Sequence, residues 1–160
     1  MVRIAIFAVM IVFYLIGTPG WMTERSLPSA LAYPLFHANV FHLCVNLVMA
    51  YGIFAPGRAG FGQLLMGYIV SIIVYPVSSV PLIGMSNILF AVLGLRTPSL
   101  SSPWWRQPAV LVFLTVMVAM VPIKNVAGLT HIMSFGLGVC LSYVGRTIKE
   151  EFKDVGRYLR

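Results

Sequence analysis

Charged residues are scarce in this chain of 160 residues: they make up 9% of it, and only four are acidic. A soluble domain carries about a quarter charged residues, so the composition excludes an ordinary water-soluble protein. Cysteine is also rare. Cys44 and Cys140 both lie in apolar stretches without metal-ligand spacing, and we expect them to be small buried residues in helix packing.

Hydrophobic residues make up 59% of the chain, and its mean hydropathy is +0.92. Apolar runs of about twenty residues, long enough to cross a bilayer as helices, recur along the whole length. Each spanning segment must satisfy its own backbone polar groups, which favours an all-α integral membrane protein. Proline, glycine and charge divide the apolar sequence into six predicted segments, at 2–16, 35–54, 61–75, 80–95, 109–121 and 126–144.

The last fifteen residues have a different pattern, in which charged residues separate apolar ones at helical spacing. This pattern predicts a basic amphipathic helix on the membrane surface, acting as an anchor. We therefore expect a membrane domain of six helices at 1–145 and a cytoplasmic tail at 146–160.

Basic residues predict the orientation, since Lys and Arg concentrate on the cytoplasmic side of membrane proteins. With the N-terminus inside, the outer loops hold only Arg25 and Lys124. The inner side holds Arg3, Arg58, Arg96, Arg106, Arg146, Lys149, Lys153, Arg157 and Arg160. Both termini are thus predicted to be cytoplasmic, in a multi-pass protein of the plasma membrane, or of the inner membrane in a Gram-negative cell. The basic residues that set this orientation explain the formal net charge of +7, so no nucleic-acid partner is expected.

In this topology the second, fourth and sixth segments all run from the outer face inward. Ser86 falls about six residues into the fourth segment and His131 about five into the sixth, so both are predicted to lie roughly 8–9 Å below the outer surface. His42 and Asn46, in the second segment, bracket a similar depth. Polar residues inside membrane segments usually face the protein interior or a wet cavity. The sequence therefore predicts a polar site that opens outward.

These residue types fit acyl transfer. A serine hydroxyl is a weak nucleophile that an adjacent imidazole can activate, and a Ser–His pair without a third acid is a workable variant. His42 and Asn46 are four residues apart on one predicted helix face, where both could donate hydrogen bonds to an oxyanion. Taken singly, Ser86 and His131 are more often residues of helix packing or of hydrogen bonding between helices. For His42 and Asn46 that explanation and the catalytic one weigh about equally.

Together the motifs resemble those of the rhomboid proteases. Residues 37–46, HANVFHLCVN, resemble the family's HxxxxHxxxN motif in the second transmembrane helix. Gly84-Met85-Ser86 is similar to the start of its GxSG motif in the fourth, and His131 followed by Gly138 resembles its catalytic-histidine helix. The resemblance covers nearly the whole chain, with the motifs on the even-numbered segments and in the family's order.

The resemblance implies that Ser86 is the nucleophile, His131 the general base, and His42 and Asn46 the oxyanion donors. It further implies supporting roles for six residues: His37 and Gly84 within the motifs, Phe90 as an aromatic packed on the catalytic histidine, Gly138, and Asn87 and Ser134.

The last two residues depart from the family pattern, because each replaces a glycine. Asparagine beside the serine could widen the dyad or block the substrate. The alternative hypothesis is that Asn87 and Ser134 hydrogen-bond to each other in place of a glycine contact. Trp21 and Arg25 are also separated in this sequence, whereas many members of the family have an adjacent Trp-Arg pair in a longer loop.

The function implied is hydrolysis of a peptide bond in a transmembrane or juxtamembrane segment of another membrane protein, without a metal or cofactor. The substrate would enter sideways from the lipid, toward a hydrated cavity bordered by residues 17–34 and 122–125.

The alternative is a catalytically inactive rhomboid-like protein that binds membrane clients. A haem or metal protein using His37, His42 and His131 is disfavoured, because His37 and His42 would lie about 140° apart on one helix. A transporter is disfavoured because the membrane segments lack acidic residues.

Overall fold

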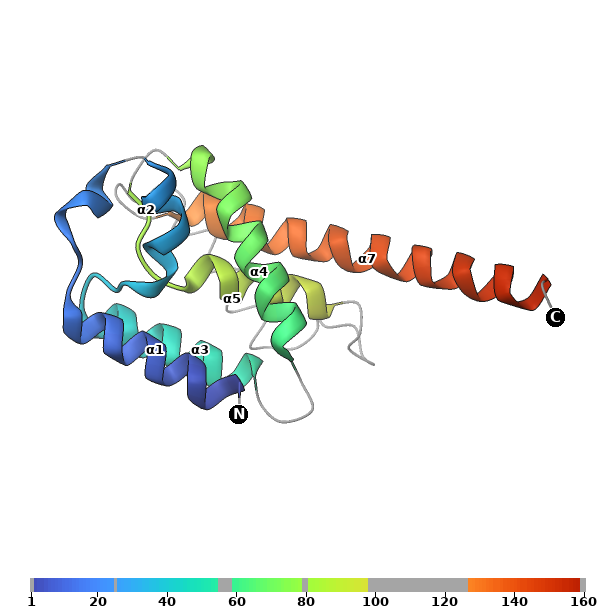
Figure 1. The fold of residues 1–160 in the computed structure, drawn as a ribbon, viewed down its shortest axis with the longest axis horizontal. Coiled ribbons are helices and arrows are strands. Elements are labelled where there is room, and N and C mark those ends of the chain that lie inside the picture. The colour runs from blue at the N-terminus through green and yellow to red at the C-terminus, as the bar shows by residue number, and fades with distance from the viewer. Residues whose placement is uncertain (1, 25, 55–58, 79–80, 98–126, 159–160) are drawn as a thin grey trace.

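The computed structural model describes residues 2–24, 26–54, 59–78, 81–97 and 127–158 of the chain. Every regular element in those ranges is helical, so the predicted all-α class is confirmed (Figure 1). The α-helices are α1 (Val2–Ile16), α2 (Leu27–Ala32), α3 (Val40–Ile53), α4 (Phe61–Val74), α5 (Ser86–Arg96) and α7 (Gly128–Tyr158). Short 3-10 turns cover Gly20–Thr23, Tyr33–Leu35 and Tyr75–Val77.

Several sequence predictions fall outside the described residues. These are the fifth segment at 109–121, the turn at 122–125, and the residues Arg25, Arg58, Arg106, Lys124 and Arg160. The first and third predicted segments match α1 and α4 closely. The 17–34 stretch, expected to be a loop, contains α2 and two of the 3-10 turns.

The second segment was predicted to begin at residue 35, but α3 begins at Val40. The preceding Asn39 has an extended backbone, and its side chain accepts a hydrogen bond from the backbone N–H of His42 at 2.8 Å. This N-cap satisfies a donor that has no partner within the helix, and so marks where the helix starts. His37 therefore lies before α3, and the predicted angle between His37 and His42 on one helix was wrong.

The fourth segment was predicted to begin at residue 80, but α5 begins at Ser86. Gly84, two residues earlier, has a φ of 107°, which a helix cannot contain. Its N–H donates to the backbone oxygen of Tyr33 at 2.9 Å, so a distant segment satisfies the non-helical backbone. Ser86 is thus the first residue of its helix rather than the sixth, and the depth estimated for it by counting residues does not hold.

The sixth segment and the tail form a single helix. α7 runs for 31 residues from Gly128 without a break at the expected boundary between 145 and 146. Its C-terminal part extends beyond the other described helices (Figure 1). His131 is the fourth residue of this helix.

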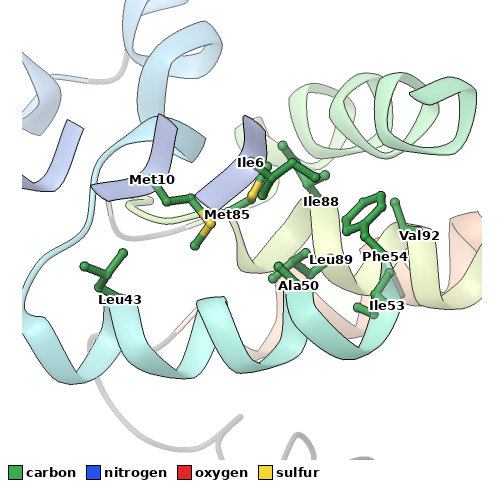
Figure 2. Packing of buried hydrophobic residues seen from close by; sticks show 10 residues of the cluster. All are labelled: Ile6, Met10, Leu43, Ala50, Ile53, Phe54, Met85, Ile88, Leu89 and Val92. Carbon is green, nitrogen blue, oxygen red and sulfur yellow. The ribbon is translucent and has the colours of Figure 1, made fainter. Parts of the chain in front are cut away.

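α5 is the central helix of the bundle and packs against α3, α4 and α7. Its residues Ile88, Leu89 and Val92 join a buried core with side chains from α1 and α3 (Figure 2). Against α7 the two backbones come very close: a Cβ at Gly94 would collide with the Phe135 oxygen, and one at Gly138 with the Ala91 oxygen. The backbones of α5 and α7 are therefore in direct contact at these two glycines.

By length and composition, one described helix is suited to crossing a membrane, over Gly128–Glu151. A second would be the pair Leu27–Leu35 and Val40–Ile53 if this pair, bent by 74°, forms one span. The other apolar helices are shorter: α5, with 11 residues, is only about 16 Å long against a hydrocarbon core of about 30 Å. Cys44 and Cys140 are exposed, so their predicted burial was wrong.

Candidate active site

Ser86 and His131 meet where α5 packs against the first turn of α7. The Oγ of Ser86 lies 2.7 Å from the Nε2 of His131, within hydrogen-bonding distance. Ser86 is 8% exposed, and His131 is half-buried. The serine hydroxyl can donate to Nε2 when His131 carries its proton on Nδ1. This is the arrangement in which an imidazole can remove a serine proton.

No described residue orients the other side of the His131 ring by a hydrogen bond, because Nδ1 is buried and has no partner. The ring is held instead by packing against Phe90, with ring centroids 4.8 Å apart and an interplanar angle of 33°. Phe90 is buried and lies one helical turn after Ser86 on α5. One short helix thus carries both the hydroxyl and the aromatic ring that face His131.

Gly84 brings His42 and Asn46 toward the same place. A Cβ at Gly84 would collide with the His42 imidazole and lie 3.3 Å from the Nδ2 of Asn46. Both side chains therefore lie over the backbone two residues before Ser86. Asn46 is 1% exposed, and neither of its amide atoms has a hydrogen-bond partner among the described residues. Its N–H groups are donors without an acceptor, as an oxyanion site requires.

Three helix N-termini converge on this region. Ser86 opens α5, while His42 and His131 lie in the first turns of α3 and α7. The first N–H groups of an α-helix have no partner within the helix, and the N-terminus carries a partial positive charge. Met85, the N-cap residue of α5, provides no side-chain cap. The local field therefore favours negative charge beside Ser86.

His37 lies next to this group, although it precedes α3. Its ring is 5.5 Å from that of His42, and the residue is 4% exposed. Neither ring nitrogen has a hydrogen-bond partner in the described part of the chain. Buried polar atoms are rarely left unpaired in proteins. The unpaired atoms of His37, Asn46 and His131 therefore indicate a polar site that can form further hydrogen bonds.

The predicted bond between Asn87 and Ser134 was wrong. The Nδ2 of Asn87 donates instead to the hydroxyl of Tyr33 at 3.1 Å, and that hydroxyl donates to the backbone oxygen of Ser71 at 3.2 Å. Ser134 is fully buried, and its Oγ has no partner among the described residues. Sequence reasoning missed Tyr33 altogether, because it lies in a stretch expected to be a loop and its partners are distant in the chain.

Among the described residues, no group of three or more His, Cys, Asp or Glu side chains is placed to hold a metal ion. Neither a scan against protein-family models nor a search of curated proteins returned a match for the chain. The resemblance to rhomboid proteases therefore rests on the motifs and on the arrangement of their residues.

Proposed function

We propose that the protein is an intramembrane serine endopeptidase that acts through a dyad of Ser86 and His131. The observation that carries the proposal is the 2.7 Å contact between Ser86 Oγ and His131 Nε2. The two residues stand 45 positions apart in the chain, and their side chains meet in a buried site beside unpaired amide donors. A serine that merely packed between helices would not require a histidine at this position.

In the proposed reaction, Ser86 Oγ attacks the carbonyl carbon of a peptide bond while its proton passes to His131 Nε2. The C–N bond then breaks as His131 returns that proton to the leaving nitrogen, which gives an acyl-enzyme on Ser86. A water molecule, deprotonated by His131, attacks the acyl carbon and releases the second product, and Ser86 recovers its proton.

The oxyanion of each tetrahedral intermediate needs fixed donors. The proposal assigns this role to the side chains of Asn46 and His42, which lie together over Gly84. The backbone N–H of Ser86 at the start of α5 supplies a further donor. All of these groups belong to the packed bundle, so they need little reorganisation when charge develops.

The proposal places the six predicted segments in a membrane, with the site opening to the outer face and the substrate entering from the lipid. It is supported by large apolar side chains on the outer surface of the helices, such as Leu15, Phe41 and Val48, which are 76%, 76% and 73% exposed. Soluble monomers rarely expose broad apolar surfaces. The non-helical backbone at 81–85 fits the same setting, since irregular backbone at membrane depth is tolerated where protein encloses it.

A fluorophosphonate probe, which reacts with activated serines, tests this proposal. Wild type, Ser86→Ala and His131→Ala are purified in detergent, checked for folding by circular dichroism, and labelled side by side. We expect labelling of wild type and none in either variant. Folded wild type that stays unlabelled would contradict the protease and favour the inactive, client-binding relative, in which client capture is unaffected by Ser86→Ala.

A further inference from the structure

Tyr33 makes three hydrogen bonds to residues distant in the chain from one buried position. Its backbone oxygen accepts from the N–H of Gly84 at 2.9 Å, and its hydroxyl donates to the Ser71 oxygen at 3.2 Å. The same hydroxyl accepts from the Nδ2 of Asn87 at 3.1 Å. Tyr33 is 1% exposed, and its ring packs on that of Tyr75 with centroids 5.3 Å apart. The ring is therefore anchored independently of Asn87.

The direction of these bonds follows from the donors available. A tyrosine hydroxyl has one proton, and the Ser71 carbonyl can only accept, so the proton points to Ser71. The remaining lone pairs of the hydroxyl must face a donor, which requires the NH₂ of Asn87 rather than its oxygen. Asn87 is thus held in one orientation, at 1% exposure.

Two hydrogen-bond partners of Tyr33 lie on either side of Ser86 in the sequence. Gly84 lies two residues before Ser86, and Asn87 follows it directly. The side chain of Met85 does not cap the helix. Tyr33 holds the backbone before the serine and the side chain after it, so its contacts define where α5 begins and where the hydroxyl points.

We propose that Tyr33 is a positioning residue for Ser86, acting through the hydrogen bond from Asn87. This inference rests on the proposed function. It also explains how a chain with asparagine, where the family pattern has glycine, keeps its serine 2.7 Å from His131. The amide of Asn87 donates to Tyr33, which lies outside α7, and not to a residue of the helix that carries His131.

The test is the second-order rate constant for labelling by the fluorophosphonate probe in Tyr33→Phe. This variant keeps the ring and its packing but leaves the Asn87 amide without its acceptor. A buried donor left unpaired and a small displacement of a reacting group both have large effects, so we expect labelling to slow about tenfold. The matched control is Tyr68→Phe on α4, whose hydroxyl donates to the Leu31 oxygen at 2.6 Å. Its labelling rate is expected to equal that of wild type.

A double-mutant cycle distinguishes a positioning role of Tyr33 from general support of the fold. Asn87→Gly removes the amide, so adding Tyr33→Phe to that background should change the rate by less than about twofold, because the two residues act through one bond. If Tyr33→Phe does not fold, Asn87→Ala, which removes the donor and leaves the bond to Ser71, is expected to slow labelling in the same direction. Thermal unfolding is followed in parallel for every variant.

The outcomes separate the two proposals. Wild-type labelling with an unchanged rate in Tyr33→Phe, or in Asn87→Ala, would overturn the positioning role and leave the protease standing. The same would follow from an equal loss in the Asn87→Gly background, or from a lower melting temperature without a slower rate per folded molecule. Folded wild type that is not labelled at all would overturn both proposals.

Discussion

The Oγ of Ser86 reaches the Nε2 of His131 at 2.7 Å because the helices that carry them touch through their backbones. Gly94 on α5 and Gly138 on α7 each lie directly against a backbone oxygen of the opposite helix. A side chain at either position would push the helices apart. The distance within the dyad therefore depends on two glycines more than one helical turn away from it.

Gly138→Ala tests that dependence. The new Cβ would collide with the Ala91 oxygen, and overpacking of this kind typically costs about 1–3 kcal/mol. Since backbone cannot move aside as a flexible side chain can, we expect α7 to shift and labelling of Ser86 by the fluorophosphonate probe to slow by about tenfold or more. Gly136→Ala is the matched control, because a Cβ there meets no atom within 4 Å. Equal rates in the two variants would show that close packing does not set the dyad distance.

Gly84→Ala tests the approach of the two predicted oxyanion donors. Gly84 has a φ of 107°, where a side chain costs about 1–2 kcal/mol, and its Cβ would displace the His42 ring. We expect a folded but less stable and poorly reactive protein, measured as a lower melting temperature together with a loss of labelling. Gly62→Ala on α4, where a Cβ has open space, serves as the control and should behave as wild type. A Gly84→Ala variant that labels at the wild-type rate would remove His42 from the proposed site.

Asn46→Ala tests the oxyanion role directly. The Asn46 amide has no partner in the described part of the chain, so its loss breaks no hydrogen bond within the fold. Removing one oxyanion donor typically lowers the rate about 10²–10³-fold, and we expect a loss of this size in cleavage of a transmembrane substrate, with little change in melting temperature. Cys44→Ala, an exposed position on the same helix, is the control. The opposite pattern, lower stability with normal cleavage, would make Asn46 a packing residue.

Motif spacing in the sequence was enough to predict which side chains would meet. Ser86 and His131 lie in contact, Phe90 packs on the histidine ring, and His42 and Asn46 lie together over Gly84. The apolar runs likewise predicted that the described elements would be helices. The helical class follows from residue types and hydrophobic periodicity, which can be read locally, whereas the packing of Phe90 on His131 was implied by the resemblance to the rhomboid motifs.

Helix starts could not be predicted in the same way. α5 begins at Ser86 because the positive φ of Gly84 is held by Tyr33, a contact between residues far apart in the chain. Asn87 and Tyr33 are 54 residues apart, and only the folded bundle makes the tyrosine a better partner than the serine one helix away. Hydropathy marks an apolar segment but not the residue at which its helix begins, so depths counted from segment ends were unreliable.

The membrane topology is open to a direct chemical test. In a variant without native cysteines, made by Cys44→Ser and Cys140→Ser, single cysteines are introduced by Glu24→Cys and Glu150→Cys, both at exposed positions. The excess of Lys and Arg on one side predicts that residue 24 faces outward and residue 150 the cytoplasm. We expect a membrane-impermeant maleimide to label position 24 on intact cells, and position 150 only after permeabilisation.

The two positions give three readable results. Labelling of both from outside would mean that an even number of spans lies between residues 24 and 150, and the six-segment topology would be wrong. Labelling of both only after lysis, with the protein in the soluble fraction, would contradict the membrane assignment itself. The expected pattern requires an odd number of crossings between residues 24 and 150. Among the described helices in that interval, the one over Gly128–Glu151 is long and apolar enough to cross a membrane by itself.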